Sequence, residues 1–280
     1  MGYKTIVAIL DSEHNAGPIS DFAAALGRQF SAHVVGLHAE TLATIPLIAP
    51  MEIPDPTAVE ALQKAAQADS TCIEGIFRNR MEPEGVSYEF RRYVSSSGYG
   101  SDSVLECARA SDLILAYQTD ERAGSDNSAN LETLLFESGR PLLLVPHVMM
   151  EAQPIRRALI AWNGSKEATR AAFDALPFLK AVESVEIFSV DPPGMPRQAP
   201  DFAGTDLAAA LSRHGIHVNL RTEENSQIPT AAAIENRLTE EGVDLLVMGG
   251  YGNSRWWEML FGGVTRSVLE SMTAVTLLSR

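Results

Sequence analysis

Short apolar runs alternate along this chain with longer stretches in which apolar residues recur every three or four positions. The first run covers 4–10, and the apolar positions after it are Ile19, Phe22, Ala23, Leu26 and Phe30. A short run of this kind predicts a buried strand, and the second pattern predicts an amphipathic helix, with Pro18 in its first turn. Strands alternating with helices indicate a parallel sheet with helices on both faces.

The same pattern occurs twice. The matching strand-like runs are 4–11 with 156–163, 33–38 with 184–189, 111–115 with 243–247, and 141–145 with 274–278. The offset falls from 152 to about 132 residues, so the first half carries about 20 extra residues. These lie within 41–80 and predict an irregular apolar loop followed by a helix over 57–77.

We therefore expect two tandem domains, 1–148 and 154–280. Each is predicted to be a three-layer α/β sandwich, with a mostly parallel five-stranded sheet flanked by helices. Right-handed crossovers would place the carboxyl ends of the strands, including Asp11, Asn163 and Gly249, along one edge of each sheet. Open parallel sheets bind their ligands at that edge.

A glycine pattern stands at one of these strand ends. The apolar run 244–248 leads into Gly249-Gly250-Tyr251-Gly252, and a second pair, Gly262-Gly263, precedes a predicted helix. Glycines permit close backbone approach, and a helix N-terminus offers free N–H groups to an anion. The pattern predicts a phosphate cradle and hence nucleotide binding. It is neither a P-loop, since no GxxxxGK[ST] is present, nor a dinucleotide fingerprint, since Arg255 replaces the third glycine.

The spacing G-x2-G-x9-G-G-V-T from Gly249 to Thr265 resembles the nucleotide signature of the universal stress protein family. The resemblance covers the whole chain as two tandem domains, and it implies an adenine-nucleotide alpha-hydrolase-like fold and an ATP-type ligand. The positions that match the family's nucleotide-binding residues are Asn163, Val190, Met248, Gly249, Gly252, Gly262, Gly263, Val264 and Thr265. Weaker candidates are Asp11, Arg255 and Arg266.

This chain departs from the family pattern in both halves. Gly263 stands where the family has Ser or Thr, and Thr265 could supply a substitute hydroxyl. Asn163 stands where the family has an adenine-side Asp, and an amide can both donate and accept hydrogen bonds. In the first half the glycine signature is absent, and 118–126 carries three acidic residues that would repel phosphates. That half keeps Asp11 and is interpreted as a degenerate copy, with a structural role or a different ligand.

The composition of the chain argues against several classes of partner. The net charge is -14 and the pI about 4.8, which argues against nucleic acid as a partner. Cys72 and Cys107 form neither a disulfide framework nor a zinc site, and His214 with His217 has no further ligand, so we expect no metal site. No apolar stretch reaches 18 residues and no signal peptide is recognised, so we expect a cytoplasmic protein without membrane association.

These patterns predict a cytoplasmic stress-response protein that binds ATP or another adenine nucleotide, with or without Mg²⁺, in its C-terminal domain. We expect a ligand-linked switch. No nucleophile triad is recognised, so any enzymatic activity would be at most slow ATP hydrolysis. One alternative is a scaffold with a relic glycine loop, which would bind a partner through the apolar insertion or through Trp256 and Trp257. Another is a binder of a small apolar ligand beneath 41–53. We also expect the two domains to pair within the chain, and a homodimer is plausible.

Overall fold

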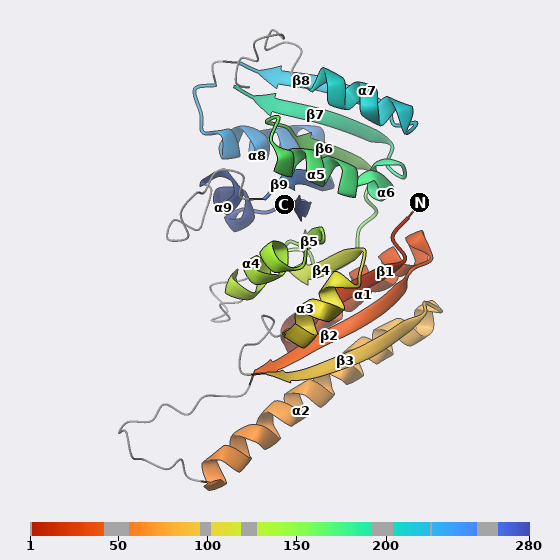
Figure 1. Ribbon diagram of the computed structural model, residues 1–280, viewed down its shortest axis with the longest axis vertical. Helices are drawn as coiled ribbons and strands as arrows, with labels where there is room; N and C mark the ends of the chain where they lie inside the picture. The colour runs from red at the N-terminus through yellow and green to blue at the C-terminus, as the bar shows by residue number, and fades with distance from the viewer. Residues whose placement is uncertain are drawn as a thin grey trace. The chain divides into compact units, whose positions relative to one another are not determined.

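The computed structural model describes residues 2–41, 56–95, 102–118, 128–191, 204–224, 226–250 and 263–280 (Figure 1). Contacts divide the chain into two compact units. The first unit comprises 3–138 and 150–152, and the second comprises 139–149 and 153–280, together with the first two residues. Residues 139–149 thus group with the second half of the chain, although the sequence pattern assigns them to the first repeat. The boundaries 1–148 and 154–280 stay a prediction about separately folding domains.

The first unit is a parallel sheet in the order β3-β2-β1-β4, with helices on both faces. Its elements are β1 (Thr5–Ile9), α1 (Glu13–Phe30), β2 (His33–Thr41), α2 (Pro56–Met81), a short 3-10 helix (Glu82–Glu84), β3 (Tyr88–Ser95), α3 (Asp102–Arg109), β4 (Leu113–Tyr117) and α4 (Ser128–Glu137).

The second unit has the strand order β5-β10-β9-β6-β7-β8, and it is parallel except that β5 runs antiparallel to β10. Its elements are β5 (Leu142–Val145), β6 (Arg157–Ala161), α5 (Lys166–Asp174), α6 (Leu176–Leu179), β7 (Ser184–Val190), α7 (Thr205–Arg213), β8 (Val218–Glu223), α8 (Thr230–Glu241), β9 (Leu245–Gly249), α9 (Gly263–Glu270) and β10 (Val275–Ser279).

The two units confirm the predicted fold class, a mostly parallel α/β sheet flanked by helices. The predicted five strands in each unit are not found among the described residues, because β5 pairs with β10 and groups with the second unit, which leaves four strands in the first unit and six in the second. The order β3-β2-β1-β4 of the first unit is repeated as β8-β7-β6-β9 in the second, as the duplicated sequence pattern predicts. Every residue of β4, β5 and β10 is buried, as is typical of the inner strands of a sheet that is covered on both faces.

The first helix begins earlier than the sequence suggested. It starts at Glu13, so Pro18 lies in its second turn, and the expectation that Pro18 occupies the first turn is wrong. The reason is local capping: the backbone N–H of Ser12 donates to Oδ1 of Asn15 at 3.3 Å, and this contact starts the helix before the apolar periodicity begins.

The predicted insertion contains the long helix α2, which packs against β2. An aromatic ring sets the distance of approach: a Cβ placed on Gly36 would lie 2.8 Å from the ring of Phe77. The helix covers the sheet only with its C-terminal part, where Ile73, Phe77 and Met81 are buried. The structure confirms a helix over the predicted range 57–77, whereas residues 42–55, the predicted apolar loop, lie outside the described part of the chain.

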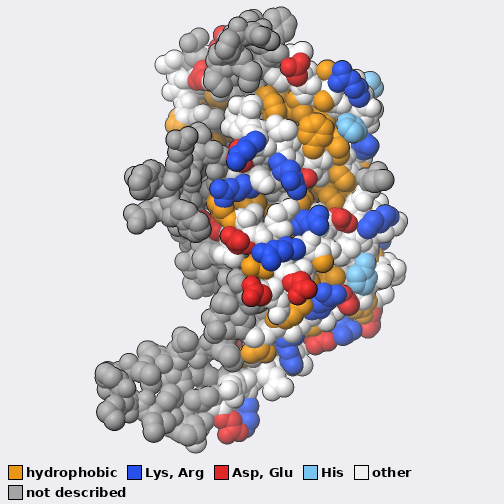
Figure 2. Space-filling view, in the orientation of Figure 1, with side chains coloured by type: hydrophobic (Ala, Val, Ile, Leu, Met, Phe, Trp, Pro, Cys, Tyr) orange, Lys and Arg blue, Asp and Glu red, His pale blue; other side chains and the backbone are white. Residues whose placement is uncertain are grey.

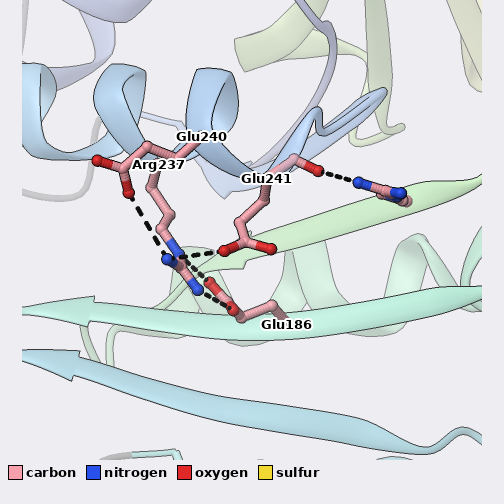
Figure 3. Close-up of polar contacts among 5 residues, drawn as sticks. Glu186, Arg237, Glu240 and Glu241 are labelled. Atoms are coloured by element: carbon pink, nitrogen blue, oxygen red, sulfur yellow. Dashed lines mark hydrogen bonds and ion pairs between the residues drawn. The ribbon is translucent and has the colours of Figure 1, made fainter.

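An ion-pair cluster fastens α8 to β7 in the second unit (Figure 3). Arg237 makes two hydrogen bonds to the carboxylate of Glu186, at 2.7 and 2.6 Å, and a further contact of 2.9 Å to Glu241. Glu240 completes the cluster at 3.7 Å. Hydrogen bonding to Glu186 raises the pKa of the Arg237 guanidinium, so this cation stays charged while it holds the helix on the sheet.

Candidate functional site

The strand order points to a candidate site in the second unit. From β6 the chain crosses over to β7 on one side, whereas β9 lies on the other side of β6. The carboxyl ends of β6 and β9 therefore flank the point at which the direction of winding reverses, where open α/β sheets bind ligands. Asn163 follows β6 there, and Gly249 and Gly250 lie at the end of β9. Sequence and topology thus point to the same edge.

Asn163 shapes the turn from β6 into α5. Its Oδ1 accepts a hydrogen bond from the backbone N–H of Ser165 at 3.0 Å, and Gly164 takes a left-handed φ of 73°. Ser165 then caps α5, its Oγ accepting from the N–H of Ala168 at 3.1 Å. The Asn163 side chain is exposed, and with Oδ1 engaged its amide nitrogen is the group it offers to a ligand.

Gly249 has a structural role that the sequence did not reveal. A Cβ at this position would lie 2.5 Å from the backbone nitrogen of Ala168 and 2.6 Å from the carbonyl carbon of Glu167. Because these are backbone atoms of α5, only glycine allows this helix to begin so close to the end of β9. The next residue, Gly250, donates its N–H to the carbonyl of Ser279 at 2.9 Å, which ties the glycine segment to β10.

Glu167 is a further residue of this edge that sequence reasoning missed. Its side chain is only 5% exposed, and its carboxylate lies 3.5 Å from the ammonium of Lys166, which is 90% exposed. Beside it, Ser279 pairs with Gly249 in the sheet register, and its buried Oγ has no hydrogen-bond partner within the described residues. A glutamate in the first turn of a helix is common, because the helix dipole favours it, so the sequence held no distinctive sign of its burial.

Some of the remaining predicted residues lie in the described part of the chain, and the others lie outside it. Val190 ends β7 and is half-buried, and Met248 is buried in β9 beside Gly249. In α9, which begins at Gly263, Val264 is exposed and Thr265 is buried in the first turn, while Arg266 donates to Glu270 at 2.6 Å. The predicted residues Gly252, Arg255 and Gly262, and with them Trp256 and Trp257, lie outside the described part of the chain.

At the corresponding edge of the first unit, polar side chains follow the ends of the described strands. Asp11 and Gln118 follow β1 and β4, and Gln118 is buried. Asn15 donates a hydrogen bond to the Asp11 carboxylate, and Nδ1 of the buried His38 lies 2.5 Å from the carbonyl of Leu10. Burial raises the pKa of Asp11 from 3.8 to about 6, against the opposing effect of its hydrogen bonds to the backbone of residues 11 and 12. This arrangement disfavours an additional negative charge.

No group of three or more His, Cys, Asp or Glu side chains in the described part of the chain is placed to hold a metal ion. Among the same residues, no helix has the length and apolar character needed to cross a membrane.

The fold and the candidate site describe a class, a duplicated α/β protein whose second unit carries two glycines at the end of the central strand β9. Among solved structures, the chain is similar to a universal stress protein from Archaeoglobus fulgidus DSM 4304, with a TM-score of 0.70 at 15% identity over 99% of this chain and 96% of that one. A candidate universal stress protein from Pseudomonas aeruginosa UCBPP-PA14 gives a TM-score of 0.61 at 14% identity, covering 99% and 93%.

The same fold also occurs in another setting. The cytoplasmic domain of a prokaryotic cation chloride cotransporter matches with a TM-score of 0.51 at 13% identity, covering 99% of this chain and 95% of that one. No model of a known protein family matches the sequence, and no curated protein sequence matches it. The chain therefore has the fold of universal stress proteins, and a function has to be argued from the site itself.

Proposed function

We propose that this protein is a stress-response protein that binds ATP or a related adenine nucleotide at the carboxyl edge of its second unit. The observation that carries the proposal is the meeting of Asn163 and the Gly249-Gly250 segment at the point where the winding of the sheet reverses. The glycine spacing of the sequence and the fold shared with universal stress proteins support it.

The matching edge of the first unit gives an internal comparison. There the strand ends carry Asp11, whose ionised form is disfavoured by burial, and the buried Gln118. An anionic ligand would meet no glycine segment at the end of β4 and would add charge beside a carboxyl group. We therefore place the nucleotide in the second unit alone, one per chain.

The test is direct. Freshly purified protein is denatured and any released nucleotide is identified by chromatography, and ATP, ADP and AMP are then titrated by calorimetry. We expect one nucleotide per chain, with binding weakened by Asn163→Ala and lost in Gly252→Val, while Asp11→Ala, the matched change in the first unit, leaves it intact. No released nucleotide and no binding heat at millimolar concentration would refute the proposal.

Binding is expected to act as a switch rather than as the first step of turnover. A ligand that prefers one conformation shifts the population by its differential affinity, so binding would change the pairing of the two domains or the assembly of a homodimer. Light scattering with and without nucleotide and Mg²⁺ measures the assembly, and phosphate release measures any slow hydrolysis. Fractionation of cells tests the cytoplasmic location that we propose.

A scaffold function is the second candidate, and exposed apolar side chains favour it. Figure 2 shows hydrophobic side chains on one face, among interspersed basic and acidic ones. In the second unit, Phe173 is 38% exposed and packs edge-to-face on His214, with ring centroids 6.3 Å apart, and Leu220 and Ile228 are each 41% exposed. If no nucleotide binds, crosslinking of these positions to a partner protein becomes the next measurement. A small apolar ligand of the first domain is the remaining alternative.

A further inference from the structure

The strand β5 belongs to the first repeat of the sequence but pairs with β10 of the second repeat. It thereby brings Arg140 to the edge of the sheet at which Gly249 and Gly250 lie. β5 runs antiparallel to β10 with Leu142 opposite Leu278. Arg140 precedes this pair by two residues and Arg280 follows it by two, so both arginines lie at the edge formed by the carboxyl ends of β9 and β10. Since Gly250 is hydrogen-bonded to Ser279, Arg280 is the immediate neighbour of the glycine segment.

The position of Arg140 is fixed by its surroundings. Gly139, with a left-handed φ of 66°, makes the turn after α4, and Pro141 restricts the residue before it to an extended backbone. The carbonyl of Gly139 accepts a hydrogen bond of 3.3 Å from the guanidinium of Arg170 in α5, the helix that packs on β9 and β10. Arg140 is half-buried at this place.

Two cations near one edge matter because the chain as a whole is strongly acidic. A net charge of -14 opposes the approach of an anion. A phosphorylated ligand therefore needs local positive charge. Guanidinium groups are suited to this, since they stay ionised and match phosphate oxygens with paired N–H donors.

We propose that Arg140 and Arg280 bind the phosphates of the nucleotide at the second unit, so that the first repeat supplies part of the site of the second. The inference rests on the proposed nucleotide function and names its ligand class, a nucleoside di- or triphosphate rather than a nucleoside. The inference also explains how the duplication could contribute to binding. Residues 154–280 alone lack Arg140, so we expect them to bind the phosphates less tightly than the full chain does.

The test measures ADP and adenosine affinities of the full chain by calorimetry, for wild type, Arg140→Gln and Arg280→Gln. The matched control is Arg156→Gln, which removes the same charge at the amino edge of the same sheet, just before β6. Because hydrogen bonds to charged groups are strong, we expect each site variant to lose about tenfold or more in ADP affinity. Adenosine affinity is expected to stay unchanged in all three variants, and ADP affinity to stay unchanged in the control.

The possible results distinguish a failure of this inference from a failure of the proposed nucleotide function. Equal losses for ADP and adenosine would mean that the arginines support the fold rather than the phosphates, and would overturn the inference, as would unchanged ADP affinity. Wild type that binds adenosine as tightly as ADP would overturn it while leaving the proposed nucleotide function in place. Wild type that binds neither would overturn both. Urea midpoints of the variants show whether any loss comes from unfolding.

Discussion

Replacement of Asp11 by asparagine is expected to stabilise the first unit at neutral and alkaline pH. Asp11 lies at the end of β1, where burial raises its pKa from 3.8 to about 6. Asparagine keeps the shape of the side chain and an oxygen that can accept the hydrogen bond from Asn15, but it carries no charge to desolvate.

The magnitude follows from linkage. A carboxyl whose pKa is raised on folding contributes stability that is fully present below 3.8 and is lost as the pH rises through about 6. A difference of about 2 pKa units corresponds to roughly 3 kcal/mol, at about 1.36 kcal/mol per unit. Asp11→Asn should therefore gain at most about 3 kcal/mol at pH 8 and nearly nothing at pH 4. This is an upper limit, because the amide nitrogen cannot accept the hydrogen bonds that a second carboxylate oxygen accepts.

The assay is urea unfolding followed by circular dichroism at pH 4 and pH 8, with hydrogen exchange of the β1 amides to assign the change to the first unit. The matched control is Asp112→Asn, because the Asp112 carboxylate instead accepts two backbone N–H bonds, from Lys4 at 2.7 Å and Thr5 at 3.0 Å. The control should not gain stability at pH 8. If the wild-type protein is as stable as the Asp11→Asn variant at pH 8, the reasoning is refuted.

Three further changes are expected to destabilise the protein, as measured by thermal and urea unfolding. Gly36→Ala places a Cβ 2.8 Å from an α2 phenyl ring and should cost about 1–3 kcal/mol. Arg237→Met leaves the carboxylate of Glu186 without its two hydrogen bonds and should cost about 3 kcal/mol. Gly249→Ala drives a methyl group into the backbone of α5, so it should cost about 3 kcal/mol and also weaken nucleotide binding.

Each change has a comparison within the chain. Gly75→Ala adds the same methyl group in α2 where nothing lies within 4 Å, so it should leave stability unchanged or raise it slightly. Arg78→Met removes an exposed guanidinium paired with Glu74 one helical turn away, and such pairs contribute little. If Gly249→Ala were as mild as Gly75→Ala, the close approach of α5 to β9 would be contradicted.

The sequence by itself determined the fold class and much of the site. Short apolar runs and period-3.6 patterns depend on local geometry, so they predicted alternating strands and helices, the duplication and the α2 insertion. The same patterns, with the rule that parallel strands present their carboxyl ends together, brought Asn163 and Gly249 to one edge. The family resemblance supplied the ligand class.

Only the tertiary structure decided which segments meet across the repeats. A run such as 142–145 predicts a buried strand, but nothing in it specifies the neighbour, and the structure pairs it antiparallel with β10. In the same way, the need for glycine at Gly249 arises from the first turn of α5, which is about 80 residues away in sequence. Burial of Glu167, and the difference between a half-buried Asp11 and an exposed Asn163, also depend on such distant contacts. The pattern of side chains along the sequence determines where helices and strands form. The close packing between these helices and strands determines which residues are buried or exposed at the carboxyl edge of the sheet.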